Sequence, residues 1–350
     1  MTQQEVPARQ RPTLEAVAAL AGVSRATVSR VVNGSPAVDP TKRAAVQQAI
    51  NELHYVPNLA ARALMTGRTY AIALVADEPD VRVFSDPYFA DIVRGVSVEL
   101  ADAGYRLTLA MIQRPEDRDH VEQYLLGHHV DGVLLISAHS DQRLADRLLE
   151  AGIPLVEGGR PVLATPRSRF VDNDNVGGAA LAARLLVAAG RRRIGTIAGP
   201  LDMSAGVDRL HGFRQALGDA FDPELVEHAN FTTTGGAEAA ERLLRRRPDL
   251  DGLFVASDLM AIGAMGVLRK AGLRIPQDVA IVGFDDIVLA AACDPPLTTV
   301  RQQPIQQGRM MVRLLLERMH HPLPDADDLP DVGDEENVVL PVDLVIRESA

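Results

Sequence analysis

The stretch TLEAVAALAGVSRATVSRVVNGS, residues 13–35, places two arginines and several hydroxyl side chains on short predicted helices. An arginine near the start of an exposed helix can make a bidentate contact to guanine in a major groove, and hydroxyl groups can bind phosphates. The candidates for base contacts are Arg25, Ala26, Ser29 and Arg30, those for phosphates are Thr13, Ser24 and Thr27, and Asn33 is a further DNA-binding candidate. The alternative is a small helical hairpin with two solvated arginines. A glycine turn, a hydroxyl cap and inward valines coincide within these 23 residues, which favours DNA contact.

A second group of polar and aromatic residues follows predicted strands in the rest of the chain. Its members are Asp86, Tyr88, Phe89, Asp172, Arg209, Phe231, Ser257, Asp258 and Asp285. A carboxylate accepts from two hydroxyls, an arginine donates to two oxygens, and an aromatic ring can cover the face of a sugar. Arg209, Asp285 and Phe231 therefore suit a carbohydrate with vicinal diols. For a single acid the alternative is helix capping, by Asp258 for one helix and by Asp285 or Asp286 for another.

The sequence lacks the common catalytic motifs. Only two lysines occur, Lys42 and Lys270, and neither follows a glycine as a phosphate-binding loop requires. None of the nine histidines forms an H-E-x-x-H pair, and no G-x-S-x-G elbow occurs. The histidine pairs at 128–129 and 320–321 are expected at the surface. We expect no enzyme activity, no cofactor and no metal site.

Composition and charge indicate a globular protein with one basic module. The chain has 350 residues, of which 47% are apolar, enough for two or three domains. Residues 1–68 hold eight basic and four acidic side chains, while the remainder carries a net charge of −15, so only the first module is expected to meet a polyanion. The single Cys293 excludes an intramolecular disulfide, and no signal sequence or membrane-spanning apolar run occurs. We expect a cytoplasmic protein without membrane contact.

The N-terminal candidates need a helix-turn-helix to position them. Thr13 can cap a first helix that Gly22 ends, and Ser24 can cap a second that Asn33 and Gly34 end. The inward faces are Leu14, Val17, Ala18 and Ala21 on the first helix, and Val28, Val31 and Val32 on the second.

A third helix is predicted after Asp39, with Pro40 in its first turn. Its residues Ala44, Ala45, Ile50 and Leu53 are expected to close a small core over the first two helices. This DNA-binding headpiece spans about 12–56.

The segment YVPNLAARALMTGRT allows two interpretations. It is a plain linker, or a hinge over 57–68 that becomes helical only on DNA, because so short a helix is marginal alone in water. In the second interpretation Leu64 wedges into a minor-groove step, and Asn58 and Ala61 also contact DNA.

The remaining residues predict an α/β body with parallel sheets. Short apolar runs alternate with helical stretches at 70–76, 106–111, 130–136, 153–157, 193–198, 226–230, 252–256 and 279–284. VDGVLLIS at 130–137 and LDGLFVAS at 250–257 echo each other, which indicates two similar halves. Ligands of such sheets bind beyond the carboxyl ends of the strands, so two facing halves would enclose a small molecule. TTVRQ at 298–302 and VDLVIRES at 342–349 are predicted as late strands.

Several motifs resemble the LacI/GalR family of bacterial transcription regulators. The N-terminal stretch followed by LHYVPNLAARAL resembles the headpiece and hinge of that family, and VDNDNVGGA, IAGPLDMSAGVDRLHGF, VASDLMAIGAMGVLRKAGLRIPQDVAIVGFDD and PPLTTVRQ resemble its effector-binding core. The resemblance covers the chain after residue 12. It implies a two-lobed, periplasmic-binding-protein-like core over 69–350. Lobe one would take about 69–172 with 303–325, and lobe two about 173–300 with 326–350.

The resemblance also implies a function and partners. We expect a repressor of sugar uptake or catabolism genes that binds a pseudo-palindromic DNA operator as a homodimer and responds to a carbohydrate. Apart from the resemblance, Phe89, Phe231 and Tyr88 could stack on more than one ring, which favours a disaccharide. Positions matching Arg209, Phe231 and Asp285 line the family's effector pocket, whereas Ser257 stands where several relatives carry Asn.

A second hypothesis comes from a different class of protein. It is a sugar-binding or sugar-processing α/β protein whose N-terminal helices make a protein contact. A gel shift with candidate operators at two salt concentrations separates the two hypotheses. The proline-rich acidic segment near 320–338 is expected to be a surface loop without chemistry.

Overall fold

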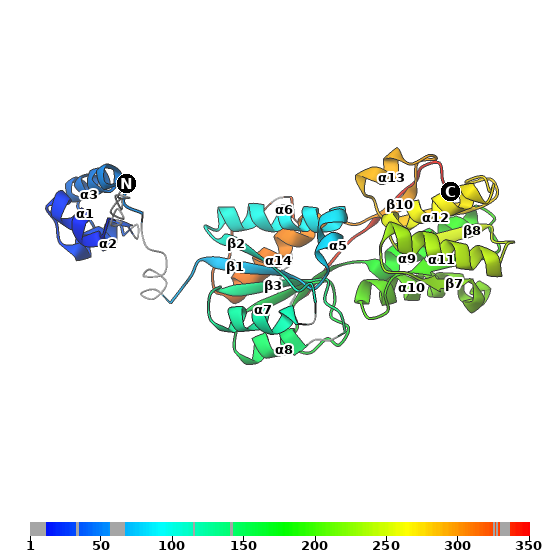
Figure 1. Ribbon diagram of the computed structural model, residues 1–350, viewed down its shortest axis with the longest axis horizontal. Helices are drawn as coiled ribbons and strands as arrows, with labels where there is room; N and C mark the ends of the chain where they lie inside the picture. The colour runs from blue at the N-terminus through cyan, green and yellow to red at the C-terminus, as the bar shows by residue number, and fades with distance from the viewer. Residues whose placement is uncertain are drawn as a thin grey trace, which may run out of the picture. The chain divides into compact units, whose positions relative to one another are not determined.

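The computed structural model describes residues 12–32, 35–56, 67–114, 116–140, 143–324, 326, 328–329 and 337–350. The chain divides into two compact units, Met1–Thr69 and Tyr70–Ala350 (Figure 1). Asn33, Gly34, Asn58, Ala61 and Leu64 lie outside the described residues, as does most of the proposed hinge.

The first unit contains the three predicted helices, α1 (Leu14–Ala21), α2 (Arg25–Val32) and α3 (Pro40–Leu53). The predicted caps are confirmed: Thr13 Oγ1 accepts from the amide of Ala16 at 3.3 Å, and Ser24 Oγ accepts from that of Thr27 at 3.2 Å. Asp39 caps α3 through Oδ1, and Gly22 ends α1 with a φ of 65°. The two helices α1 and α2 therefore form the helix-turn-helix that the sequence predicts.

The core of this unit differs from the prediction at α3. Val46 and Ala49 are the buried residues of this helix, with Ile50 and Leu53 partly buried beside them. Ala44, which we expected in the core, is exposed, and Ala45 is only partly buried. Residues 46, 49, 50 and 53 have the spacing of one helix face, and this face packs inward. Val46 is bulkier than Ala44 or Ala45, so burying the face that carries it removes more apolar surface from water.

Lobe one is built on a six-stranded sheet in the order β11-β5-β4-β3-β1-β2. Its strands are β1 (Ala71–Ala76), β2 (Arg106–Met111), β3 (Gly132–Ile136), β4 (Leu155–Gly158), β5 (Phe170–Asn173) and β11 (Val338–Leu340). Its helices are α5 (Asp80–Ser85), α6 (Pro87–Asp102), α7 (Asp117–Leu126), α8 (Arg143–Glu150) and α14 (Pro304–Arg318). All its strand pairs are parallel.

Lobe two has a similar six-stranded sheet in the order β12-β10-β9-β8-β6-β7. Its strands are β6 (Ile194–Ala198), β7 (Val226–His228), β8 (Gly252–Val255), β9 (Ala280–Asp285), β10 (Thr298–Arg301) and β12 (Asp343–Val345). Its α-helices are α9 (Asn175–Ala188), α10 (Ser204–Leu217), α11 (Thr233–Arg246), α12 (Asp258–Lys270) and α13 (Val288–Ala292), and two short 3₁₀ helices span Gly218–Ala220 and Pro223–Leu225. Only β12 runs antiparallel to its neighbour.

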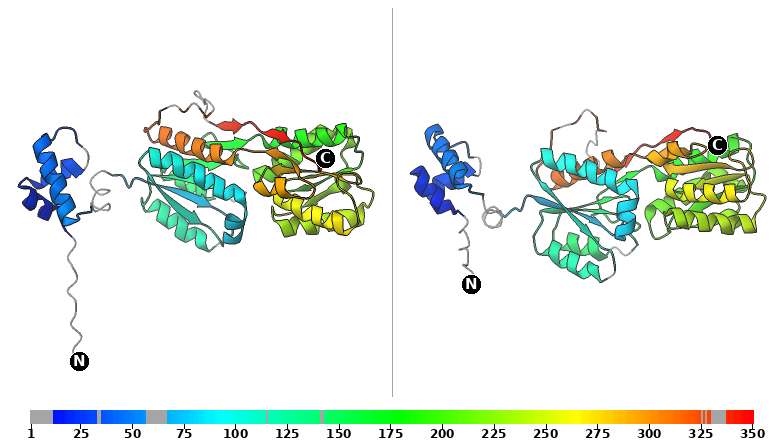
Figure 2. Two further views of the ribbon diagram at one scale, coloured as in Figure 1. Left: turned by 90° about the horizontal axis from the view of Figure 1, so that it is seen from above. Right: turned by 45° about the horizontal axis from the view of Figure 1, so that its top comes forward.

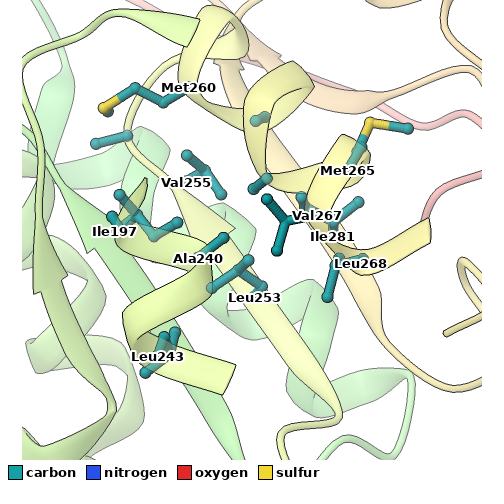
Figure 3. Packing of buried hydrophobic residues seen from close by; sticks show 14 of the residues in the cluster. Ile197, Ala240, Leu243, Leu253, Val255, Met260, Met265, Val267, Leu268 and Ile281 are labelled. Carbon is teal, nitrogen blue, oxygen red and sulfur yellow. The ribbon is translucent and has the colours of Figure 1, made fainter. Parts of the chain in front are cut away.

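Both faces of each sheet are covered by helices, which explains the continuous apolar runs in the sequence. In lobe one, α6 and α14 cover one face, and α7 and α8 cover the other. In lobe two, α9 and α10 cover one face. On the opposite face, Ala240 and Leu243 of α11 and Met260 and Leu268 of α12 pack with strand residues such as Val255 (Figure 3).

The chain passes between the lobes three times, between β5 and α9, between β10 and α14, and between β11 and β12 (Figure 2). The last passage corrects the expected lobe boundary. The segment Val338–Leu340 pairs with β5 in the sheet of lobe one, so this part of 326–350 does not belong to lobe two. The eight predicted body strands and the two late strands are all present, and β5 and β11 were not predicted.

No helix among the described residues combines the length and the apolar character that crossing a membrane requires.

Candidate DNA-binding surface and ligand pocket

Helix α2 presents a polar face beside its buried valines. Val28 and Val31 fix the inward side, and Arg25, Ala26 and Arg30 are exposed. An ion pair of 3.2 Å joins Arg25 to Glu15 of α1, but the two side chains are 70% and 59% exposed. A pair so accessible to solvent is weak, which leaves the Arg25 guanidinium available for an anionic or base-edge partner.

The hydroxyl residues near these helices have a structural role in the free protein. Thr13 and Ser24 accept backbone amide hydrogens as caps, and the Ser24 and Thr27 hydroxyls lie 2.9 Å apart. Thr13 and Ser24 are exposed, whereas Thr27 and Ser29 are partly buried. A capping hydroxyl accepts through a lone pair and keeps its hydrogen as a donor, so the Thr13 hydroxyl, which is hydrogen-bonded to Glu15 in the free protein, could donate to a phosphate in its place.

A pocket lies between lobe one and lobe two, with about 700 Å³ of empty space that is open to solvent. Residues that follow the carboxyl ends of strands in both sheets line it, as expected where open parallel sheets face each other. Its lining is Arg82, Asp86, Tyr88, Ser137, Ala138, Gly158, Gly159, Arg160, Asp172, Asn173, Asn175, Met203, Ser204, Ala205, Arg209, Phe231, Ser257, Asp285, Gln302 and Gln307.

Arg209 of α10 is a cation in the wall of this pocket and is only 5% exposed. Its Nε donates to Asn175 Oδ1 at 2.8 Å, and its Nη1 donates to the carbonyl of Ala256 at 2.6 Å and to Asp285 Oδ1 at 3.3 Å. The guanidinium carbon stands 3.7 Å from the centroid of the Phe284 ring. These contacts hold the guanidinium in one orientation at the pocket wall.

Two carboxyl groups of the pocket have raised pKa values although protein donors already contact them. Burial raises the pKa of Asp285 to about 7, although the neighbouring Arg209 guanidinium acts in the opposite direction and Gln302 donates to Asp285 at 2.7 Å. Burial likewise raises the pKa of Asp172 to about 6, although the amide of Asn173 donates to it at 2.8 Å. A ligand that supplies hydroxyl donors would stabilise the ionised form of both groups.

Phe231 forms an apolar wall of the same pocket. Its ring is 5% exposed and has guanidinium carbons on two sides, Arg82 at 5.1 Å and Arg209 at 5.8 Å from its centroid. Gly199 allows this placement, because a Cβ there would lie 2.2 Å from Phe231 Cζ. The backbone of Phe231 is in the left-handed region, with a φ of 60°.

Most of the residues predicted from the sequence for the ligand site come together at this pocket. They are Asp86, Tyr88, Asp172, Arg209, Phe231, Ser257 and Asp285. Asp86 also caps α6, accepting from the amide of Tyr88 at 3.1 Å, and burial raises its pKa. The Tyr88 hydroxyl lies 3.3 Å from Gln307 Oε1, to which it donates, and burial raises the tyrosine's pKa. Ser257 caps α12 by accepting from the amide of Met260 at 3.3 Å.

Two predicted ligand residues lie elsewhere, and the prediction is corrected for both. Phe89 is 1% exposed within the core of lobe one, because Phe89, Ile92 and Val96 form the inward stripe of α6 while Tyr88 faces the pocket. Asp258 is fully buried at the start of α12, where its Oδ1 accepts from the Thr299 hydroxyl at 2.6 Å and its Oδ2 from the amide of Ile287 at 3.0 Å. Asp258 joins three segments of lobe two, and the expected capping of α12 is performed by Ser257.

The sequence analysis missed several polar residues of the pocket. Ser137 and Arg160 follow predicted strands and Gln302 is the last residue of one, so the position at a strand end was a signal that could have found them. Arg82 and Gln307 lie on helices and carry no such signal. Gln307 is 1% exposed, and it donates to the carbonyl of Val171 at 2.8 Å and accepts from Asn173 at 3.0 Å.

Within the described part of the chain, no group of three or more His, Cys, Asp or Glu residues is arranged to hold a metal ion.

Comparison with known proteins agrees with this organisation. Residues 13–58 match the family model of bacterial regulatory proteins, lacI family, and residues 183–350 match the periplasmic binding protein-like domain. Among solved structures, the lac repressor dimer bound to operator and the anti-inducer ONPF has a TM-score of 0.82 at 26% identity, covering 97% of this chain and 99% of the other. A structure described as a transcriptional regulator CelR–cellobiose complex has a TM-score of 0.75 at 45% identity, with 97% and 100% covered.

The sequence relatives include the HTH-type transcriptional regulator CelR of Thermobifida fusca, which is 48% identical over 97% of this chain and 99% of its own length. The helix-turn-helix, the two parallel-sheet lobes and this near full-length relationship lead to one conclusion: the chain belongs to the LacI family of bacterial transcriptional regulators.

Proposed function

We propose that this regulator represses genes of sugar uptake or catabolism and responds to a two-ring glucoside such as cellobiose. The observation that carries the proposal is the buried Arg209–Asp285 pair beside the Phe231 ring in the inter-lobe pocket. A relative of 45% identity is described in complex with cellobiose, which supports the choice of sugar.

The chemistry of the pocket matches a polyhydroxyl ligand. Arg209 can donate to a ring hydroxyl oxygen, and Asp285 can accept from the neighbouring hydroxyl, which together recognise a vicinal diol. The raised pKa values of Asp172 and Asp285 have burial as their main cause, and hydroxyl donors would relieve this cost. The Phe231 ring offers an apolar surface to the carbon face of a sugar.

We further propose that α2 reads the operator. Its exposed Arg25 and Arg30 suit contacts in a major groove, with Ala26 and Ser29 beside them and Thr13, Ser24 and Thr27 at phosphates. Asn33, Asn58, Ala61 and Leu64 are proposed to complete the DNA contact. Because bacterial DNA lies in the cytoplasm, a DNA-binding role places the protein there as part of this proposal.

A homodimer on a pseudo-palindromic operator is part of the proposal. A single headpiece buries too little surface for tight specific binding. The described structure exposes large apolar side chains that a second copy could cover, among them Phe84 of α5 at 72% and Val288 of α13 at 87%.

The test combines calorimetry with gel shifts on the upstream region of the protein's own operon. Wild type is expected to bind cellobiose and to release operator fragments when the sugar is added, and Arg209→Met should abolish the sugar response while DNA binding persists. Arg147→Met is the matched control, because Arg147 pairs with Glu122 on α7, outside the pocket lining.

Two outcomes would contradict the proposal. Wild type that binds none of the β-linked or α-linked disaccharides tested would exclude the proposed effector. Sugar binding without any salt-sensitive gel shift would favour the alternative in which the N-terminal helices contact a protein.

A further inference from the structure

Two charged pairs join lobe one to lobe two beside the pocket. Arg160, which follows β4 of lobe one, donates from Nη2 to Asp208 Oδ1 at 2.7 Å and from Nε to Asp208 Oδ2 at 3.2 Å. Asp208 lies on α10 of lobe two. His139, which follows β3 of lobe one, has its Nδ1 2.7 Å from Oδ2 of Asp202, which precedes α10. We refer to Arg160–Asp208 and His139–Asp202 as the inter-lobe pairs.

The Arg160–Asp208 pair has the geometry of a strong ion pair. Two nitrogens of the guanidinium face the two oxygens of the carboxylate, and such a fork is stronger and more directional than a single contact. The Asp208 side chain is only 14% exposed, so solvent screens this pair less than a fully exposed one. The two lobes also approach each other closely here, because a Cβ on Gly159 would lie 3.9 Å from Ser204 Oγ.

The His139–Asp202 pair is ionic at neutral pH. His139 has a carboxylate near each ring nitrogen, Asp202 at Nδ1 and the buried Glu78 3.6 Å from Nε2. The interaction with Glu78 raises the pKa of His139 to about 9, so the imidazole is protonated at neutral pH. Asp202 is 51% exposed, so we expect this pair to be weaker than the arginine fork.

The position of α10 allows the inter-lobe pairs to limit rotation of the lobes. The lobes are connected through residues 174, 302–303 and 341–342, and short connections of this kind can act as hinges. In the sheet of lobe two, β9 and β8 separate the crossing strand β10 from β6, which leads into α10. A rotation about the connections can therefore separate α10 from the ends of β3 and β4, and the inter-lobe pairs oppose that separation.

The inter-lobe pairs are next to residues of the ligand pocket. Asp208 directly precedes Arg209 of the pocket wall, and the backbone amide of Arg160 donates to Asp172 of lobe one. Asp202 and Asp208 themselves do not belong to the pocket lining. A ligand that contacts both lobes needs them close together, so any interaction that favours the closed arrangement also favours binding.

We propose that the inter-lobe pairs hold the two lobes together in the ligand-free protein and thereby keep the pocket in the arrangement that binds the ligand. Asp202 and Asp208 act through the arrangement of the lobes and not through contact with the ligand. The affinity measurement below rests on the proposed function, because it uses cellobiose, whereas the measurement of molecular size does not.

The first measurement is small-angle X-ray scattering of the full chain without sugar. The double variant Asp202→Asn/Asp208→Asn removes the negative charge from both pairs with little change in side-chain volume, and its radius of gyration should exceed that of wild type. Asp278→Asn is the matched control, because Asp278 accepts a fork from Arg274 within lobe two, at 2.7 and 2.8 Å, and it should keep the wild-type radius. Equal radii for wild type and the double variant overturn the inference.

The second measurement is the dissociation constant for cellobiose by calorimetry. It should rise about 3- to 30-fold in the double variant, because the apparent affinity falls with the fraction of molecules whose lobes are closed. Asp278→Asn should bind as wild type does. Asp202→Asn alone, at a half-exposed position, should show a smaller rise and serves as the variant if the double variant does not fold.

A double-mutant cycle tests whether the histidine pair acts as a unit. His139→Gln and Asp202→Asn combined should weaken cellobiose binding no more than the stronger of the two single substitutions, and fully additive effects would exclude a role for this pair. A larger radius in the Asp202→Asn/Asp208→Asn variant with unchanged affinity overturns the inference that the pairs maintain the pocket. Wild type that does not bind cellobiose overturns the proposed function, and the comparison of radii then still decides whether the pairs hold the lobes together.

Discussion

Replacing Gly199 by alanine tests whether the Phe231 ring must lie where the structure has it. The added Cβ would stand 2.2 Å from Phe231 Cζ and 2.5 Å from Cε1. Ordinary carbon contacts are about 3.5–4.0 Å, so the ring has to retreat by more than about 1 Å. Overpacking of this kind costs about 1–3 kcal/mol, and the ring would move within a pocket wall that Arg82 and Arg209 already flank.

The expected result follows from this cost. If the displaced ring removes its contact with the ligand, the dissociation constant for cellobiose in isothermal calorimetry rises about 5- to 100-fold, since about 1.4 kcal/mol corresponds to a factor of ten. Scanning calorimetry should show a melting temperature lower by about 2–10 °C.

Gly266→Ala is the matched control for this substitution. Gly266 lies within α12, and a Cβ there would meet no atom within 4 Å. Alanine in a helix interior is favoured over glycine by about 0.5–1 kcal/mol, so this variant should be as stable as wild type or slightly more stable, with unchanged affinity. A Gly199→Ala protein that binds cellobiose with the wild-type dissociation constant would refute the assignment of Phe231 to the ligand.

Four further outcomes are expected. Arg25→Ala should weaken operator binding by about 1–3 kcal/mol and relax preference at one base pair per half-site; unchanged preference in a binding-site selection would exclude a base contact. Leu64→Ala should reduce both operator affinity and the DNA bend in circular-permutation gel shifts, and equal bends would contradict a wedge role. Because a hydrogen bond to its carboxylate partner raises the pKa of His139 to about 9, its stabilising effect is complete below about pH 6.5 and is lost as pH rises through 9. The melting temperatures of wild type and His139→Gln should therefore converge in alkaline buffer. A difference that stays constant with pH would show that the charged form of His139 does not stabilise the fold. Thr299→Val removes the hydroxyl that donates to the buried Asp258 at 2.6 Å and should lower the free energy of urea unfolding by about 2–3 kcal/mol. A loss below about 0.5 kcal/mol would show that this hydrogen bond does not stabilise the buried Asp258 carboxylate.

The headpiece was predictable from sequence because its determinants are local. The caps at Thr13, Ser24 and Asp39 bond to amides no more than three residues away, so a short window of sequence contains both partners. The inward face of α3 was less accessible to prediction. Ala44 and Val46 are both apolar, and their burial depends on where α1 and α2 lie, which is tertiary information.

In the body, the position at a strand end predicted much of the pocket but not the direction of individual side chains. Tyr88 and Phe89 are adjacent, and only the packing of α6 on its sheet sends the first to the pocket and the second to the core. Asp258 follows a strand as the pocket residues do, but its partner Thr299 lies 41 residues away. The short strand β11 pairs with a strand more than 160 residues earlier, a pairing that no local pattern reveals.

Strand β1 leads from the start of the second unit toward Glu78, so it connects the chain that follows the DNA-binding unit with the body of lobe one. The strand begins one residue after Tyr70, where the second unit starts, and ends two residues before Glu78. Its six residues are all buried and are paired with β2 and β3 on both edges, so it can neither shorten nor bend independently. At about 3.3 Å per residue the six residues of the strand span about 20 Å. Because β1 is held on both edges by its sheet, the start of the second unit is fixed to lobe one and must move with that lobe.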